Sequence, residues 1–185
     1  EEEIRKTSDE EPFAGLAFKI ATDPFVGSLA YFRAYSGVLS AGSYVYNSTK
    51  EKKERVGRLV QMHSNERKDI SEICSGDICA IVGLKYTTTG DTLCDEKLKI
   101  KYYDIPLPKP VITMKISAAK SGEEDKVFQG LNRLAEEDLT FIVEKDKDTG
   151  ETVIRGQGET HLEVLCKKLK AKFGCEAVLS EPKVA

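Results

Sequence analysis

Two different periodicities of apolar residues divide this chain, and they predict two different kinds of structure. Up to residue 105 the apolar positions alternate over short runs, and turns such as Ser36-Gly37 and Thr89-Gly90-Asp91 separate these runs. Alternation with a period of two is typical of half-buried strands. Examples are the runs 16–20, 43–47 and 97–102. Many short strands with no long helical stripe predict a closed, all-β barrel over residues 1–105.

After residue 110 the pattern changes to strands that alternate with helices. The predicted strands are 112–116, 141–143, 152–154 and 177–179. Ser121-Gly-Glu-Glu124 and Thr160-His-Leu-Glu163 match the capping-box pattern, and a helical apolar stripe follows each of them. Gly174 is placed to end the second helix in the left-handed conformation. The order βαββαβ predicts a ferredoxin-like α+β sandwich over residues 111–185.

A proline-rich stretch separates the two patterns. Pro106, Pro108 and Pro110 alternate with Leu107 and Lys109. Proline fixes φ and pushes the preceding residue toward extended geometry, so residues 106–110 are predicted to form a stiff linker. The chain is therefore expected to hold two domains joined by this linker.

Charge and hydropathy exclude several classes of function. The 28 Lys and Arg residues nearly balance the 31 Asp and Glu residues, and the net charge of −3 argues against nucleic-acid binding by bulk charge alone. No apolar run approaches the roughly 18–20 residues needed to cross a bilayer. The acidic start, Glu1-Glu2-Glu3, is unlike a signal peptide. We therefore expect a cytoplasmic protein without a membrane partner.

The residues that carry chemistry are few. The cysteines form no Cys-x-x-Cys pair, and only His63 and His161 could complete a metal site, so no metal is expected. The stretch 146–150 approaches a calcium-loop pattern, but its glycine is one position early and Gln157 stands where the bidentate Glu belongs. His161, at a helix start, could act as an acid or base, yet no nucleophile accompanies it. A structural or interface role is favoured, and no catalytic residue is expected.

The patterns for phosphate and base recognition are mostly absent. The chain has no P-loop pattern, and the stretch 155–161 lacks the third glycine of a dinucleotide fingerprint. Glu159 would repel a phosphate at that helix start. The glycines of this stretch are instead predicted to let two backbones approach closely. The central strands of the second domain carry no aromatic residue on which a base could stack.

A basic run in the first domain has two interpretations. It comprises Lys50, Lys52, Lys53, Arg55 and Arg58. Because Glu51 and Glu54 lie among these cations, a solvated surface is the simpler interpretation. A contact with RNA phosphates is the alternative.

Several strings of residues in both domains resemble motifs of one known family. In the first domain these strings are residues 22–37, 47–50, 53–55, 57–59, 61–65, 76–77 and 87–94, and in the second domain the string is residues 155–163. They resemble motifs of elongation factor G, the ribosomal translocase, and residues 155–163 resemble the Gly-x-Gly-Glu-x-His-Leu-Glu motif of the factor's domain III. Thr160 stands where the family usually has a larger apolar residue, and Arg155 where a small one is common. The chain thus resembles domains II and III, with a translation-factor type barrel first.

The resemblance implies a function that is mechanical rather than chemical. It implies that the parent protein is a GTPase that drives tRNA–mRNA translocation, with GTP or GDP and Mg²⁺ held in a GTPase domain that this chain lacks. This chain would bind no cofactor and would act as a monomer. Its barrel would pack on that GTPase domain and touch small-subunit ribosomal RNA. Its second domain would relay the nucleotide state, beside a small-subunit ribosomal protein and the binding place of fusidic acid.

The same resemblance assigns candidate residues to the second domain. The interdomain and ribosome interface is expected to use Arg155, Gly156, Gly158, Glu159, His161, Leu162 and Glu163. Other functions stay open at this point. The chain could come from a tetracycline-resistance ribosomal protection protein, from a release-factor GTPase, or from a stand-alone ribosome- or RNA-binding module.

Overall fold

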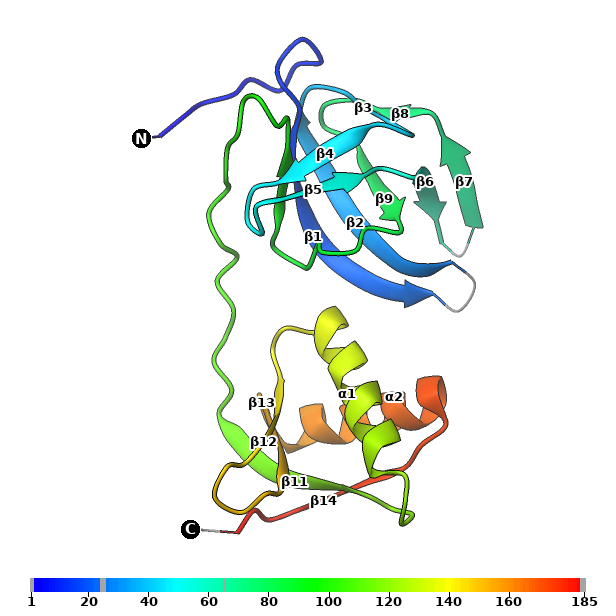
Figure 1. Ribbon diagram of the computed structural model, residues 1–185, viewed down its shortest axis with the longest axis vertical. Coiled ribbons are helices and arrows are strands. Elements are labelled where there is room, and N and C mark those ends of the chain that lie inside the picture. The colour runs from blue at the N-terminus through cyan, green and yellow to red at the C-terminus, as the bar shows by residue number, and fades with distance from the viewer. Residues whose placement is uncertain (1, 24–25, 65, 184–185) are drawn as a thin grey trace. The chain divides into compact units, whose positions relative to one another are not determined.

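A computed structural model of the chain describes residues 2–23, 26–64 and 66–183 (Figure 1). They fold as two compact units, Glu1–Ile105 and Pro106–Ala185. Pro24, Phe25 and Asn65, which belong to the motifs quoted above, lie outside the described residues.

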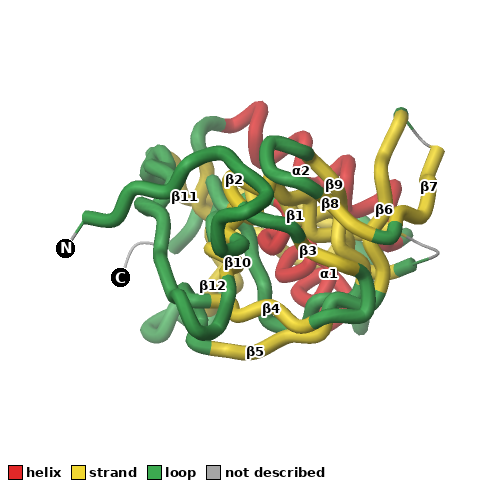
Figure 2. The backbone as a smooth tube through the Cα atoms, turned by 90° about the horizontal axis from the view of Figure 1, so that it is seen from above, coloured by secondary structure: helices red, strands yellow, loops and turns green. Residues whose placement is uncertain are grey.

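The first unit consists of short antiparallel strands. They are β1 (Ala14–Asp23), β2 (Gly27–Ser36), β3 (Leu39–Ser40), β4 (Tyr44–Asn47), β5 (Lys52–Arg55), β6 (Arg58–His63), β7 (Glu66–Ile70), β8 (Glu72–Ile73), β9 (Ile78–Val82) and β10 (Thr92–Cys94). One sheet has the order β5-β4-β10-β1-β2-β9-β6-β7, and its β6–β7 hairpin is seen from above in Figure 2. β3 leads into β4 near one end of this order, and β8 follows β7 at the other end. The β3–β8 pair therefore joins the two ends, and the predicted barrel is confirmed as a barrel-like domain.

The inward residues of these strands form the core of the barrel. Phe32 is fully buried and packs edge-on against Phe13, with 5.7 Å between the ring centroids. A Cβ atom on Gly15 would lie 2.3 Å from Cε2 of Phe32 and 2.6 Å from the carbonyl oxygen of Arg33. Position 15 therefore has to be glycine for β1 to lie this close to β2.

The strand predicted at 97–102 is wrong. These residues follow β10 as an irregular segment that joins no sheet. Hydrogen-bond partners for their backbone come from side chains instead: Ser48 Oγ donates to the carbonyl of Ile100, and Thr92 Oγ1 accepts from the amide of Tyr102. Of its apolar side chains, Ile100 and Tyr102 are half-buried but Leu98 is 54% exposed, so the alternation follows burial only in part.

The second unit has the predicted order of elements. They are β11 (Ile112–Ala118), α1 (Glu124–Glu137), β12 (Ile142–Lys145), β13 (Thr152–Gly156), α2 (Glu159–Phe173) and β14 (Ala177–Ser180). The antiparallel sheet has the order β12-β13-β11-β14, and both helices pack on one of its faces (Figure 1). The ferredoxin-like fold is thereby confirmed. A Cβ atom on Gly130 would lie 2.5 Å from Cδ1 of Leu169, so this glycine lets α1 approach α2 closely.

Both predicted capping boxes are wrong, whereas the predicted helix end is confirmed. Neither helix has a side-chain hydrogen bond at its N-cap, which is Glu123 for α1 and Gly158 for α2. Ser121 lies in the turn before α1, and Thr160 already lies inside α2, so both hydroxyls are out of register with the first free amides. Gly174 ends α2 with a φ of 64°, and its amide donates to the carbonyl of Lys170.

Candidate functional site

The motif 155–163 spans the end of β13, a short connection and the first turn of α2. Arg155 lies on the exposed side of β13 and pairs with Glu144 of β12, with 2.5 Å between Nη2 and Oε1. Leu162 points into the core and is fully buried. Glu159 and Glu163 are exposed on α2. The motif therefore contributes one side chain to the core and presents three charges at the surface.

The two glycines of the motif do different things. A Cβ atom on Gly156 would lie 2.6 Å from Cδ2 of Leu162 and 3.0 Å from Nδ1 of His161. Gly158 has nothing within 4 Å of such an atom, and its φ of 167° is ordinary extended backbone. The predicted close approach of two backbones is therefore wrong. A larger residue at position 156 would collide with side chains of α2, whereas position 158 has space for a side chain.

His161 is held from both sides of its ring. Nδ1 accepts a hydrogen bond from the backbone amide of Gln157 at 3.1 Å, and Nε2 lies 3.0 Å from Oδ2 of Asp138. Because Nδ1 accepts, the ring proton is on Nε2 and is donated to Asp138. The edge of the ring also meets Phe141, with 6.2 Å between centroids. Both nitrogens are engaged within the chain, which favours the structural role over acid–base chemistry.

Asp138 ties the end of α1 to the start of α2. Its amide donates to the carbonyl of Leu134 at the end of α1, and its carboxylate accepts from the hydroxyl and amide of Thr140 as well as from His161. Burial alone would raise the pKa of this carboxyl, but the hydrogen bonds from Thr140 and His161 hold the pKa below its ordinary value. The carboxylate therefore keeps its charge to a lower pH than an ordinary aspartate does.

Gln157 is the residue of this motif that sequence reasoning missed. Its side-chain amide donates to the carbonyl of Thr140 at 3.1 Å and to the carbonyl of Pro108 at 3.3 Å, while its backbone amide serves His161. The only indication in the sequence was that Gln157 lies between two glycines, which offer its side-chain amide no side-chain partner. Gln157 links the motif to the proline-rich linker.

A shallow groove of about 510 Å³ lies between the start of α2 and β14. It is lined by the apolar residues Met114, Cys166 and Leu179 and by the exposed charged residues Glu159, Glu163 and Lys167. Two carboxylates at a helix start oppose phosphate binding. The residues present therefore do not fit a GTP site, and we assign no nucleotide chemistry to this domain.

The basic run does not form one surface. Lys50 pairs with Asp91, with Nζ and Oδ1 3.8 Å apart, and Arg58 makes a two-pronged contact with Asp69 of β7. Lys52 is exposed at the start of β5. Lys50 and Arg58 are thus each neutralised by a carboxylate at a different place on the barrel.

Lys53 and Arg55 belong to a different surface, with aromatic neighbours. The β4–β5 register places Tyr46 opposite Lys53 and Tyr44 opposite Arg55, so these four side chains share the outer face of the two strands. Lys99 adds its ammonium 4.2 Å from the ring centroid of Tyr46. We call these five residues the β4–β5 outer face. The basic run in the sequence includes two of its three cations, Lys53 and Arg55, whereas Tyr44, Tyr46 and Lys99 lie outside that run.

The charge of Lys53 is reinforced locally. The hydrogen bond and the negative charge of Glu96 raise the pKa of this lysine, with 2.5 Å between Nζ and Oε2. The ammonium also lies 5.4 Å from the ring centroid of Tyr44, which is 63% exposed. An anion that replaced Glu96 here would meet a cation and an accessible aromatic ring.

The assignment of Glu54 to a solvated face is wrong. It is only 5% exposed, because alternation along β5 turns it into the barrel. Its carboxylate accepts from the amides of Lys85 and Tyr86, at 2.6 and 2.9 Å, and from the hydroxyl of Thr87. These donors lie further along the chain, at separations of 31 to 33 residues. A buried carboxylate with these partners is a structural element.

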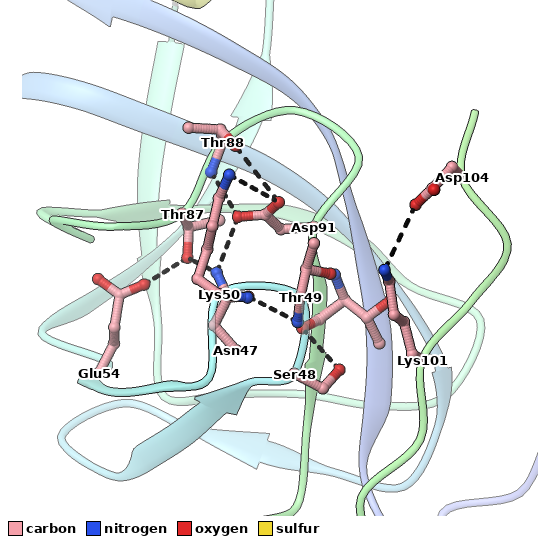
Figure 3. A network of polar contacts seen from close by, with 11 residues as sticks. Asn47, Ser48, Thr49, Lys50, Glu54, Thr87, Thr88, Asp91, Lys101 and Asp104 are labelled. Carbon is pink, nitrogen blue, oxygen red and sulfur yellow. Dashed lines mark hydrogen bonds and ion pairs between the residues drawn. The ribbon is translucent and has the colours of Figure 1, made fainter. Parts of the chain in front are cut away.

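Glu54 belongs to a buried polar network that joins the β4–β5 turn to the loop before β10 (Figure 3). The side-chain amide of Asn47 donates through Nδ2 to Asp91 Oδ2 at 2.9 Å and to Thr87 Oγ1 at 3.1 Å. The side-chain oxygen Oδ1 of Asn47 accepts from the backbone amides of Thr49 and Lys50. Asn47 therefore shapes the turn that carries Lys50 and ties it to the barrel.

Two patterns, a membrane-spanning helix and a metal site, are absent from the described parts of the chain. In these parts of the chain, no helix is long and apolar enough to span a membrane. Nor do three or more His, Cys, Asp or Glu side chains gather there in a group that could hold a metal ion.

A barrel-like domain followed by a ferredoxin-like domain, with a polar scaffold in the first and a tied helix start in the second, is the architecture of the middle domains of a translation factor. Comparison with known families agrees domain by domain. Residues 12–96 match elongation factor G domain 2, and residues 107–181 match elongation factor G domain III. The chain belongs to the elongation factor G family, and it comprises these two domains.

A solved structure supports the same assignment. The crystal structure of a protein from Thermus thermophilus matches with a TM-score of 0.81 and 26% sequence identity. The match covers 94% of this chain and 26% of that chain. This chain thus spans about a quarter of the length of that relative.

Proposed function

We propose that this chain is the non-catalytic middle part of a translational GTPase that moves tRNA and mRNA through the ribosome. The observation that carries the proposal is the pairing of elongation factor G domains 2 and III in one chain, in that order. GTP and Mg²⁺ would be held by a separate GTPase domain of the full-length factor, in the cytoplasm. This chain would contact the small subunit as a monomer and pass on the nucleotide state.

We further propose that the β4–β5 outer face is the part of the barrel that meets ribosomal RNA. Lys53, Arg55 and Lys99 supply cations for phosphates, and Tyr44 supplies an exposed ring. Lys50, in the turn between β4 and β5, and Arg58, on β6, lie outside this face and should contribute less. Counterion release at phosphates makes such binding strongly dependent on salt.

Sedimentation of the chain with isolated small ribosomal subunits over a salt series tests this proposal. Lys53→Gln with Arg55→Gln should weaken binding and lower the salt slope by about 2, one for each phosphate that is no longer neutralised. The matched control is Lys19→Gln with Lys68→Gln, because these exposed lysines lie on β1 and β7 and their removal changes the net charge equally. Equal effects of the two pairs would refute the assignment of this face.

The relay through domain III is tested in the full-length factor. His161→Ala removes the link between Asp138 and the amide of Gln157, and Arg155→Ala removes the surface charge of β13. Both variants should slow translocation in a single-turnover ribosome assay while leaving the fold intact by circular dichroism. Unchanged translocation rates in both variants would refute the proposal that domain III relays the nucleotide state.

A further inference from the structure

The segment that leaves the barrel is fastened by side chains of the barrel. Ser48 Oγ donates to the carbonyl of Ile100 at 2.6 Å, and the amide of Tyr102 donates to Thr92 Oγ1 at 2.9 Å. The ring of Tyr102 also packs on Tyr35, with 5.3 Å between centroids. Thr92 is fully buried, so its hydroxyl is a fixed anchor. This stretch is therefore held to the barrel at Ile100 and Tyr102.

The segment that enters the barrel takes part in the same fastening. The side chain of Arg5 is only 6% exposed, and its Nη2 donates to the carbonyl of Leu98 at 2.6 Å. Its Nη1 donates to the carbonyl of Pro12 at 3.5 Å, and Tyr103 donates its hydroxyl proton to Glu2 at 2.8 Å. The entering and leaving segments are therefore bonded to each other as well as to the strands.

The far end of the linker is fastened to domain III. The amide of Val111 donates to the carbonyl of Gly156 at 2.8 Å, just before β11 begins. The side-chain amide of Gln157 donates to the carbonyl of Pro108 at 3.3 Å, and it is itself anchored on Thr140. The predicted stiff linker thus belongs in part to domain III, because its carboxyl half is bonded to the motif.

Between these fastenings only a short stretch is left. Asp104 is paired with Lys101, at 3.7 Å between Oδ1 and Nζ, but both side chains are mostly exposed, and such pairs stabilise little. Ile105 and Leu107 are 38% and 45% exposed. In the described chain no hydrogen bond fastens residues 105–107 to either domain.

We propose that the interdomain segment is latched at both ends, by Thr92 in the barrel and Gln157 in domain III, so that hinge motion is confined to residues 104–107. Pro106 fixes one of the few torsions in this hinge. The latches determine where the chain leaves one domain and enters the other, and each can open without unfolding its domain. This inference rests on the contacts within each domain and does not depend on ribosome binding.

Nuclear magnetic resonance on the full chain tests the two latches. Thr92→Val keeps the shape of the side chain but removes the acceptor for the Tyr102 amide, so hydrogen exchange of that amide should become about 2- to 10-fold faster. Gln157→Ala should free Pro108, and ¹⁵N relaxation of Leu107 and Lys109 should show larger fast motions. With both substitutions the stretch that shows fast motions should extend beyond residues 104–107 on both sides, whereas in the wild type it should be confined to them.

Matched variants separate latching from general loosening. Thr89→Val removes the same kind of bond within the barrel, since Thr89 Oγ1 accepts from the amide of Ile20 at 3.2 Å. Gln61→Ala removes an exposed glutamine on β6. Neither should change the exchange of Tyr102 or lengthen the stretch that shows fast motions. The proposal is overturned if Tyr102 exchanges as fast as Leu107 in the wild type, if Thr92→Val speeds the exchange of Tyr102 no more than Thr89→Val does, or if Lys109 already moves as freely as Leu107 in the wild type.

Discussion

Gly156→Ala is the substitution for which the structure gives the clearest expectation. The added methyl group would lie 2.6 Å from Leu162 Cδ2 and 3.0 Å from His161 Nδ1. Leu162 is fully buried and cannot move away without disturbing the core. Forcing extra volume into a packed site costs about 1–3 kcal/mol, and displacing His161 adds the loss of its bond to Gln157. We expect a loss of about 2–4 kcal/mol in the free energy of unfolding of domain III.

Urea unfolding followed by circular dichroism at the helical band measures this loss, because α1 and α2 of the described chain both belong to domain III. Gly158→Ala is the control from the same motif. It meets nothing within 4 Å and has an extended backbone, so it should cost under about 1 kcal/mol.

A double variant identifies the cause of the effect. Leu162→Ala alone should cost about 2–5 kcal/mol by leaving a cavity, but it also removes the atom that Gly156→Ala would strike. The double variant should therefore be more stable than the sum of the two single losses predicts, by about 1 kcal/mol or more. Simple additivity, or a Gly156→Ala protein as stable as the Gly158→Ala protein, would refute the steric reasoning.

Three further predictions concern other buried groups. Asn47→Ala should cost about 1–3 kcal/mol of barrel stability, measured by urea titration, because it leaves Asp91 without its amide donor. The pKa of Asp138 is lower in the fold than in the unfolded chain, so its stabilising effect is present above the unfolded pKa and is lost as pH falls through the folded one. Asp138→Asn should flatten that acid-side decline in circular dichroism titrations below about pH 4. Burial raises the pKa of Cys79 to about 12, so a thiol reagent at about pH 8 should modify this residue only after unfolding, as mass spectrometry of the labelled peptides would show.

Periodicity predicted the elements of this chain well, because the side-chain pattern of a strand or helix is local. It failed for residues 97–102, whose backbone is hydrogen-bonded to the side chains of Ser48 and Thr92 rather than paired with a strand. The capping-box patterns at 121–124 and 160–163 failed for a related reason. A cap depends on the residue at which the helix begins, and the spacing alone does not fix that residue.

The candidate sites were harder to predict, since their partners are distant in the sequence. The sequence predicts Glu54 to be part of a charged run, because its hydrogen-bond donors lie in a distant loop at 85–87. Gln157 gave little signal beyond its place between two glycines, because its acceptors are backbone carbonyls of Pro108 and Thr140. Every residue has a backbone carbonyl, so the sequence does not indicate which carbonyl will accept a hydrogen bond from a given side chain.

The motifs that carry the family resemblance in the barrel mostly build its scaffold. Asn47, Thr87 and Asp91, which lie in the matched strings, are buried and bonded to one another. Tyr44 and Lys99 of the β4–β5 outer face lie outside those strings, yet Tyr44 is positioned by the strand that Asn47 ends, and Lys99 reaches Tyr46 of that strand. The resemblance therefore transfers the fold and the bonded residues that build it, whereas the face proposed to meet ribosomal RNA includes residues that the motifs leave out. Experiments on function should thus vary the outer face and use the network residues only to measure stability.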